Sequence, residues 1–256
     1  MIFATDLDRT MIYSKRFLEK INSKDVTLVE TLDGKEISYM SKQAIKKLEL
    51  LIKEIQVIPV TTRSVKQFKR VKVFEQCEYA ITSNGGIILH RGEILPEWEK
   101  VTQRLLESYE KSFKKIIQVL ENQDFITKKP SLVDGKFVFT KTNNVQECKE
   151  FLERIIDPNI WNYTIQNQKV YVIPKKITKG FTLEYLCEKL LNDYEVIAAG
   201  DSLMDLDMLE YAKCAIIPRH GELNPMYTGK NQKTFVVGEG MNAANDILTI
   251  VLESIK

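Results

Sequence analysis

The chain has 256 residues, of which 44% are hydrophobic, enough for one large domain or two modest ones with a proper core. Its 37 lysines and arginines nearly balance its 35 aspartates and glutamates, so the composition shows no electrostatic footprint for nucleic acid or for a membrane surface. We therefore expect neither a nucleic-acid partner nor a membrane partner.

The cysteine pattern indicates a reducing compartment. The four cysteines are far apart without C-x-x-C spacing, and the chain has only two histidines, so neither a zinc site nor a disulfide framework is indicated. The opening apolar run meets Asp6 before a signal-peptide core could form, and no apolar stretch approaches membrane-spanning length. We expect a cytoplasmic protein.

The first predicted strand ends at acidic residues. Residues 1–5 form an apolar run, and Asp6, Asp8 and Thr10 follow it directly. In an open α/β sheet, ligands bind outside the carboxyl ends of the strands, so these acids mark a prospective site. An isolated Asp-x-Asp pair is more often a solvated turn or a helix cap, so the motif needs support from other segments.

A hairpin and a helix are predicted next. Residues 26–40 form two short strands around Asp33-Gly34, a dipeptide typical of hairpin turns, and we expect this hairpin to be a flap beside the site. Ser41 can cap a helix that runs to about residue 54, because apolar residues recur there at helical spacing.

Two further strands complete the first part of a parallel sheet. They are predicted over 56–60 and 79–82, with a short helix between them, and the second ends at Ser83-Asn84-Gly85-Gly86. Parallel units of this kind wind right-handedly and place their strand tips together.

Between residues 87 and 174 the pattern changes to two helix-strand-strand units. The predicted elements are a long helix over 97–121, strands over 124–128 and 137–141, a helix over 144–156, and strands over 160–166 and 169–173. The loop between the first two strands would hold Pro130 and Asp134-Gly135. This alternation predicts a compact α+β insertion.

From Lys179 the chain returns to α/β character. The predicted elements are a helix over 179–191, a strand over 195–199, a short helix after Asp205, strands over 214–217 and 234–237, and a helix over 241–255. The predicted fold class is therefore α/β, a Rossmann-like, doubly wound and mainly parallel sheet. Its core would comprise residues 1–86 and 175–256, with residues 87–174 inserted as a cap.

Three later segments support the acidic motif. The strand at 57–60 ends in Thr61, Thr62, Arg63 and Ser64; Lys179-Gly180 precedes an apolar helix; and the strand at 196–199 is followed by Asp201 and Asp205. The chain thus has four motifs in order: a strand ending in acids, a strand ending in hydroxyls, a lysine, and a second strand ending in acids. In this order it resembles the haloacid dehalogenase superfamily of phosphohydrolases, over essentially the whole chain. The insertion resembles the cap of its Cof-like and sucrose-phosphate phosphatase-like branch.

The resemblance implies a set of metal-binding carboxylates and a covalent mechanism. Asp6 would be the nucleophile that forms an aspartyl-phosphate, and Asp8 the general acid and base. Mg²⁺ would be held by Asp6, Asp201 and the carbonyl of Asp8, and Asp205 would mostly support these ligands without binding the metal directly.

Other residues would contact the phosphoryl group or the substrate. The resemblance implies that Thr61 and the amide of Thr62 hold the phosphoryl oxygens, while Lys179 balances their charge and orients Asp6. Thr61 could instead be a helix cap beside Ser64. Lys175 or Lys176 could take the place of Lys179, although Lys179-Gly180 matches the family better.

Four more residues are candidates for substrate binding: Arg9, Arg63, Asn84 and Gly85. Arg9 stands where the family commonly has glycine, and its guanidinium could grip a second anionic group, or point to solvent or pair locally. Asn84-Gly85 could be only a turn. Thr62 and Met204 also depart from the family pattern, which affects the identity of the substrate rather than the reaction.

The resulting hypothesis is a Mg²⁺-dependent phosphatase, a phosphoric monoester hydrolase, that acts on a small, sugar-phosphate-like metabolite. The alternatives are a phosphomutase or phosphotransferase with the same intermediate, or a non-catalytic protein that binds a phosphorylated ligand. A phospho-receiver module would not place its nucleophile on the first strand. We expect hinges at 84–86 and 174–176 and leaving-group specificity from the cap; the sequence leaves the oligomeric state and the substrate open.

Overall fold

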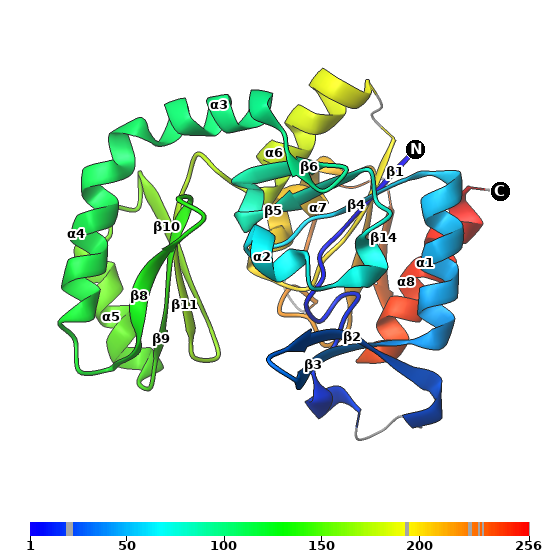
Figure 1. Cartoon of the computed structure of the whole chain (residues 1–256), viewed down its shortest axis with the longest axis horizontal. Helices are drawn as coiled ribbons and strands as arrows, with labels where there is room; N and C mark the ends of the chain where they lie inside the picture. The colour runs from blue at the N-terminus through cyan, green and yellow to red at the C-terminus, as the bar shows by residue number, and fades with distance from the viewer. Residues whose placement is uncertain (19–22, 193–194, 225–226, 230, 232, 256) are drawn as a thin grey trace. The chain divides into compact units, whose positions relative to one another are not determined.

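The structure is a computed structural model that describes residues 1–18, 23–192, 195–224, 227–229, 231 and 233–255 (Figure 1). It divides into two compact units, residues 1–95 with 178–256 and residues 96–177. The second unit begins later than residue 87, because strands β6 (Ile87–His90) and β7 (Glu93–Ile94) continue an antiparallel sheet that starts at β5 (Tyr79–Thr82).

The first unit contains a five-stranded parallel sheet in the order β14-β13-β12-β1-β4. Its strands are β1 (Ile2–Thr5), β4 (Gln56–Pro59), β12 (Val196–Ala199), β13 (Cys214–Pro218) and β14 (Lys233–Val237). The inner strands are short apolar runs rather than alternating ones, as expected for a sheet that is covered on both faces. This is the doubly wound, Rossmann-like class that the sequence predicts.

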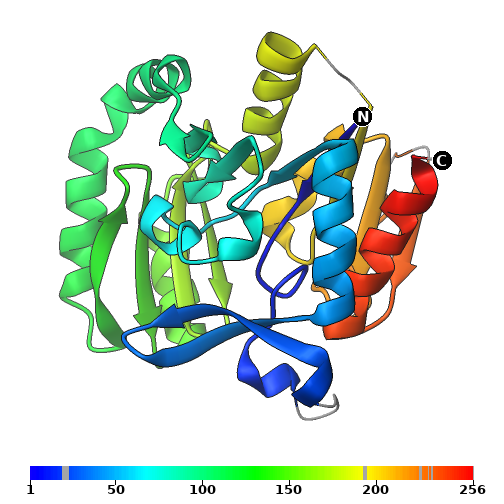
Figure 2. The same cartoon turned by 45° about the vertical axis from the view of Figure 1, so that its right-hand side comes forward.

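Helices cover the faces of this sheet. On one face, α1 (Lys42–Glu54) and α8 (Met241–Ser254) lie side by side and share a core cluster with alternate strand residues such as Phe3 (Figures 1 and 2). The buried residues Ile2 and Ala4 lie outside that cluster, because successive side chains of a strand point to opposite faces of the sheet. The other α-helices among the described residues of this unit are α2 (Val65–Phe68), α6 (Lys179–Leu186) and α7 (Leu206–Tyr211).

The predicted hairpin is formed by β2 (Val26–Leu32) and β3 (Lys35–Ser41), with positive φ at Asp33 and Gly34 in its turn. Ser41 ends the hairpin and begins α1, since its side chain accepts a hydrogen bond from the amide of Ala44 at 3.1 Å. The hairpin and the helix cap are confirmed.

The second unit contains a four-stranded antiparallel sheet in the order β10-β11-β9-β8. The strands are β8 (Ile126–Val133), β9 (Phe137–Thr142), β10 (Trp161–Gln166) and β11 (Lys169–Pro174), and the second helix is α5 (Val145–Ile155). Tyr109 and Phe113 meet the ring of Trp161 edge to face at centroid distances of 4.9 and 5.1 Å. These aromatic contacts anchor the core between the first helical segment and the sheet.

The prediction of one long helix over 97–121 is wrong. The segment consists of α3 (Pro96–Leu106), a 3₁₀ turn (Glu107–Tyr109) and α4 (Glu110–Glu121), which run in different directions in Figure 1. A 3₁₀ turn repeats every three residues, so the apolar spacing continues through the break and does not reveal it.

Pro130 lies within β8, not in the loop where the sequence placed it. β8 is an edge strand, and its register shifts between Lys128 and Ser131. Both features explain how a residue without an amide proton fits into a sheet.

The four cysteines are all free and buried. Among the described residues, no helix is both long enough and apolar enough to cross a membrane.

Candidate active site

The acidic residues meet because neighbouring parallel strands end at one edge of the sheet. Thr5, the last residue of β1, is in register with Ala199, the last residue of β12. Asp6 follows at once, and its amide donates a hydrogen bond to the carbonyl of Ala199 at 2.9 Å. Asp201 follows the neighbouring strand after one glycine, so both side chains start from the same edge.

Three carboxylates form one buried cluster at this edge. Asp6, Asp201 and Asp205 each offer an oxygen atom, and these atoms lie within 4.8 Å of one another. The structure therefore brings together acids that are about 200 residues apart in the chain, as the predicted strand order requires.

Lys179 provides the cation of this cluster. Its ammonium nitrogen lies 2.6 Å from Oδ1 of Asp6 and 2.5 Å from Oδ1 of Asp205, and the side chain is 1% exposed. The lysine is the first residue of α6, which Thr178 caps by accepting a hydrogen bond from Phe181. Lys175 and Lys176, the alternatives from the sequence, are exposed.

The contact between α6 and α7 places Lys179 against Asp205. The amide of Gly180 donates a hydrogen bond to Oδ2 of Asp207 at 3.0 Å. A Cβ atom at position 180 would lie 2.5 Å from the backbone carbon of Asp207, so only glycine allows the two helices to approach this closely. Asp207 thus caps α6 from the neighbouring helix.

Asp205 is fully engaged by protein groups. Its Oδ1 atom binds Lys179, and its Oδ2 atom accepts hydrogen bonds from the amides of Asp201 and Ser202 and from the Ser202 hydroxyl, at 2.9 to 3.1 Å. Both oxygens of Asp205 are thus already engaged by protein groups. Its geometry suits a residue that holds the loop and the lysine behind the cluster.

Burial and crowding raise the pKa values of the other two carboxyls. Burial raises the pKa of Asp6 to about 7, with Lys179 opposing the shift and Asp205 adding to it. Burial, together with Asp6 and Asp205, raises the pKa of Asp201 to about 8. Burial alone would lower the pKa of Lys179, but the two carboxylates raise it above its ordinary range. The cluster holds more negative charge than its lysine balances.

The donor set fits Mg²⁺. Oδ2 of Asp201 is buried and makes no hydrogen bond to any described residue; its nearest cationic atom is Nε of Arg9, at 3.3 Å. Oxygen atoms of one or two carboxylates are the protein ligands that Mg²⁺ commonly takes, and Asp6 and Asp201 can supply them.

Asp8 stands apart from the cluster and is held by Arg63. The guanidinium donates to both carboxylate oxygens of Asp8, from Nε at 2.6 Å and from Nη2 at 2.8 Å. We expected Arg63 to bind substrate, but in the structure its side chain, which is 11% exposed, is engaged by Asp8 and by Glu30. The carboxylate of Asp8 is 48% exposed and can reach a ligand.

Thr61 follows β4 at the same edge of the sheet and is buried. It does not cap α2, because Ser64 and Gln67 form a capping box there. Its hydroxyl accepts a hydrogen bond from the amide of Arg63 at 3.1 Å, which shapes the loop that also carries Thr62.

Asn84 is close to this loop, and Gly85 has a structural role. The amide of Asn84 donates to the carbonyl of Thr61 at 3.0 Å, and its buried Oδ1 atom has no hydrogen-bond partner among the described residues. Gly85 has a φ of +98°, and a Cβ there would lie 2.2 Å from the carbonyl oxygen of Thr178. Close backbone approach therefore explains the glycine.

Arg9 pairs locally, one of the alternatives that the sequence left open. Its φ of +68° lies in the region that favours glycine, which accounts for the residue the family commonly has there. Its Nη2 atom donates to the carbonyl of His220 at 2.8 Å. Nδ1 of His220 accepts from the amide of Gly240, so Nε2 carries the proton and donates to the carbonyl of Arg9 at 2.8 Å.

Sequence reasoning missed several residues of this site. Ser202, His220 and Glu30 each contact a candidate residue or its direct partner, but none belongs to a motif with characteristic spacing. Only the strand-tip position of Ser202 could have signalled its role.

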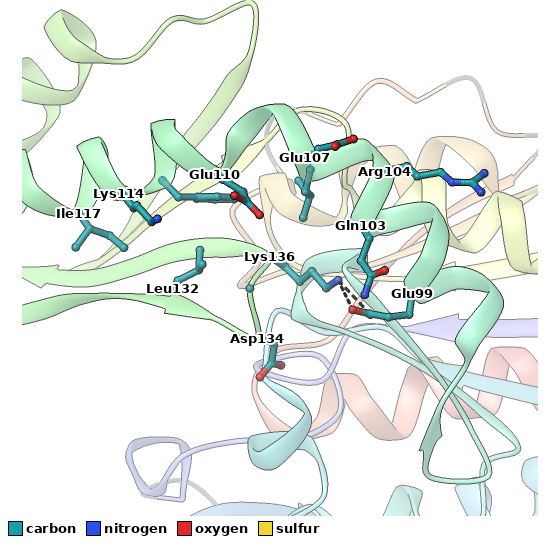
Figure 3. A pocket seen from close by; sticks show the side chains of 13 residues that line it. Glu99, Gln103, Arg104, Glu107, Glu110, Lys114, Ile117, Leu132, Asp134 and Lys136 are labelled. Carbon is teal, nitrogen blue, oxygen red and sulfur yellow. Dashed lines mark hydrogen bonds and ion pairs between the residues drawn. The ribbon is translucent and has the colours of Figure 1, made fainter.

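A separate pocket of about 650 Å³ lies within the second unit, between α3, α4 and the β8–β9 turn (Figure 3). Its most buried charged residue is Lys136, whose ammonium contacts both carboxylate oxygens of Glu99 at 3.1 Å and the Thr102 hydroxyl at 2.8 Å. The lysine is thereby saturated, and it fastens the turn to α3.

Comparisons with known proteins agree with this architecture. A family model described as haloacid dehalogenase-like hydrolase matches residues 99–219. A sucrose-phosphatase from Synechocystis sp. PCC6803, solved with sucrose and phosphate, is similar over 99% of this chain and 97% of its own, with 15% identity and a TM-score of 0.68. No curated protein matches the chain by sequence.

Two phosphatases have the same fold. One is BT1666 from Bacteroides thetaiotaomicron, a phosphatase of the haloalkanoate enzyme superfamily. The match covers 100% of this chain and 95% of BT1666, with 13% identity and a TM-score of 0.59. The other is the subclass IIB sugar phosphatase BT4131. The match covers 100% of this chain and 99% of BT4131, with 13% identity and a TM-score of 0.58.

The parallel sheet and the inserted α+β unit form the fold that these phosphatases share, and the cluster of acids and lysine lies at the strand tips of that fold. The chain is thus similar to the haloacid dehalogenase-like hydrolases, in sequence over residues 99–219 and in fold over almost its whole length.

Proposed function

We propose that this enzyme is a Mg²⁺-dependent phosphatase that hydrolyses a small phosphorylated metabolite through an aspartyl-phosphate. The observation that carries the proposal is the contact of Lys179 with Asp6 beside the unsatisfied Oδ2 atom of Asp201. Lys179 and Arg9 supply cationic groups beside these carboxylates, and the donor set also suits a metal ion.

Asp6 is the proposed nucleophile. One of its carboxylate oxygens binds Lys179, and the other, Oδ2, accepts a weaker hydrogen bond of 3.2 Å from the Thr10 hydroxyl. Attack through Oδ2 forms a bond to phosphorus while the bond to the leaving oxygen breaks. Lys179 holds Asp6 in place and balances charge throughout the transfer.

Asp8 is the proposed general acid and base. It donates a proton to the leaving oxygen in the first step, and in the second it takes a proton from the water that attacks the phosphorus of the aspartyl-phosphate. Release of phosphate then restores Asp6, and both protonation states of Asp8 are used once in each cycle. Proton transfer of this kind contributes about 10²- to 10⁴-fold to the rate.

Asp6, Asp201 and the Asp8 carbonyl are the proposed Mg²⁺ ligands, with Asp205 keeping the loop and Lys179 in place. When bound, Mg²⁺ would neutralise negative charge on the nucleophile and on the phosphate oxygens. Thr61, Thr62 and Asn84 are proposed to contact the phosphoryl group or the substrate.

The proposed substrate class is a sugar phosphate or a similar small metabolite. Two of the similar structures are sugar phosphatases by their descriptions, one of them bound to sucrose and phosphate. We propose that residues 1–86 and 175–256 carry out the chemistry and that the cap, residues 87–174, recognises the leaving group.

A substrate panel tests this function. Sugar phosphates, nucleotides and phosphoribosyl compounds would be incubated with the enzyme, with Mg²⁺ and with chelator, and free phosphate and isomerised product would be measured separately. The proposal expects Mg²⁺-dependent release of phosphate. Isomerised product without free phosphate would establish a phosphomutase instead, and binding without turnover would establish a non-catalytic protein.

A further inference from the structure

A buried carboxylate on the flap hairpin lies at the centre of a charged network. The side chain of Glu30, on β2, is 0% exposed. Its Oε2 atom contacts Nη1 of Arg63 at 2.9 Å and accepts from the Ser38 hydroxyl at 2.7 Å, and its Oε1 atom contacts Nη2 of Arg70 at 2.8 Å. A carboxylate is buried this completely only when it is paired and hydrogen-bonded, as here.

Arg63 connects this carboxylate to Asp8. Its guanidinium is planar and has three nitrogen atoms, of which Nε and Nη2 bind Asp8 while Nη1 binds Glu30. Because all three nitrogen atoms are engaged, the plane of the guanidinium is fixed. The two parallel bonds to Asp8 then fix the plane of its carboxylate as well.

The network is electrically balanced. Arg63 and Arg70 contribute two positive charges, and Glu30 and Asp8 contribute two negative charges. Burial alone would lower the pKa of Arg63, but Asp8 and Glu30 raise it, so this arginine stays charged.

We infer that Glu30 is a positioning residue: by fixing the guanidinium of Arg63, it fixes the carboxylate of Asp8 in the orientation from which Asp8 protonates the leaving oxygen. The inference rests on the proposed function. Asp8 is half-exposed, so without Glu30 its carboxylate and the guanidinium of Arg63 would be oriented only by each other. The buried Glu30 holds the guanidinium in place through its contact with Nη1 of Arg63.

The hairpin is also tied to the loop that carries Asp8. Tyr13 and Tyr39 exchange backbone hydrogen bonds of 2.9 and 2.8 Å, which join the segment after Asp8 to β3. The hairpin therefore supports Asp8 through the backbone and, by way of Glu30 and Arg63, through its side chain.

The test compares substrates whose leaving groups differ in their need for a proton. Hydrolysis of p-nitrophenyl phosphate depends little on protonation of its leaving group, whereas hydrolysis of an alkyl phosphate depends on it strongly. We expect E30Q to lower kcat for the alkyl phosphate by about 10²-fold, and kcat for p-nitrophenyl phosphate by less than about 10-fold. KM should change little for either.

Two variants make the result independent of folding defects. R63K keeps the charge but loses the planar group that binds Asp8 through two nitrogen atoms. We expect the same selective loss of kcat for the alkyl phosphate. R70K is the matched control, because Arg70 contacts Oε1 of Glu30, on the side away from the oxygen that binds Arg63; it should leave the ratio of the two kcat values within about 2-fold of the wild type. If E30Q does not fold, E30D takes its place, because it keeps the charge but draws the carboxylate back from Arg63; the same selective loss is expected, and an unchanged kcat ratio overturns the inference.

Failure of the inference is distinguishable from failure of the proposed function. A wild-type enzyme that hydrolyses neither phosphate ester contradicts the proposed function. An active wild type, together with E30Q and R63K variants that slow both substrates equally or neither, overturns the positioning role of Glu30. A crystal structure of E30Q adds a readout without turnover, and we expect Arg63 there to lose its bidentate contact with Asp8.

Discussion

The ammonium nitrogen of Lys179 lies 2.6 Å from Oδ1 of Asp6, although 173 positions separate the two residues in the chain. The contact joins the tip of the first strand to the start of the helix that follows the insertion. It uses one oxygen of Asp6 and leaves the other, Oδ2, with the weaker hydrogen bond from Thr10.

Replacing Asp6 by asparagine should abolish turnover without loss of the fold. Asparagine is nearly isosteric, but it is a poor nucleophile, so we expect kcat to fall on the order of 10⁴-fold or more. Because the cluster holds excess negative charge, the urea midpoint of D6N should equal or exceed that of the wild type. Exposed Asp124 offers the control D124N, which should keep full activity. Wild-type turnover in D6N would rule out Asp6 as the nucleophile.

K179M should be strongly destabilised. Removal of one partner from a buried ionic cluster typically costs about 3 to 5 kcal/mol, because the remaining charges are left uncompensated. We expect this loss in urea unfolding at pH 8 and a smaller one at pH 5, where the carboxyls can bind protons instead. K176M, at an exposed lysine, should change stability by less than about 0.5 kcal/mol. Equal losses in the two variants would contradict the assigned cluster.

Mg²⁺ binding should release protons and strengthen with rising pH. Without metal, the pKa values of Asp6 and Asp201 are raised to about 7 and about 8, above the ordinary 3.8. The folded state then holds protons that the unfolded state has released, so the stability of the metal-free protein should fall as pH rises from about 4 to about 8. Calorimetry in buffers of different ionisation enthalpy would count the released protons.

Thermal unfolding gives a second measure of the same site. Mg²⁺ at 100 times its dissociation constant should stabilise the wild type by about 2.7 kcal/mol. D201N should lose most of this gain, because Asp201 provides the buried oxygen without a hydrogen bond. An unchanged Mg²⁺ effect in D201N would exclude Asp201 as a ligand.

His220 should make stability depend on pH below neutrality. Burial lowers its pKa from 6.5, with the hydrogen bond to the Arg9 carbonyl opposing the shift, and Nδ1 can accept from the amide of Gly240 only when the ring is neutral. A folded pKa below the unfolded value means that the stabilisation is fully present above about pH 6.5 and is lost as pH falls below it. H220Q should show a shallower loss of stability between pH 7 and pH 5 than the wild type; parallel curves would show that His220 does not contribute.

Gly85 and Gly92 form a matched pair for testing close packing against backbone strain. Both have positive φ, of +98° and +80°, but a Cβ at Gly85 would meet Thr178 at 2.2 Å, whereas nothing lies within 4 Å at Gly92. We expect G92A to cost about 1 to 2 kcal/mol from strain alone and G85A to cost clearly more. Equal unfolding free energies would show that the contact with Thr178 relaxes without cost.

Hydrophobic periodicity and strand-end residues were enough to predict the sheet, the hairpin, the Ser41 cap and the edge where Asp6 and Asp201 meet. These features follow from local rules: a short apolar run is a buried strand, and the tips of parallel strands share one edge. The family resemblance then pointed to Lys179 rather than to its exposed neighbours.

Side-chain partners depended on packing between distant segments. The saturation of Asp205, the pairing of Arg63 with Asp8 and Glu30, and the link between Arg9 and His220 each join elements whose separation is set only when the helices pack. The break at residues 107–109 was hidden for a related reason, since a 3₁₀ turn preserves the apolar spacing. A sequence pattern specifies which face of an element is buried, but the group that a buried charge meets is set by the three-dimensional contact that must compensate it.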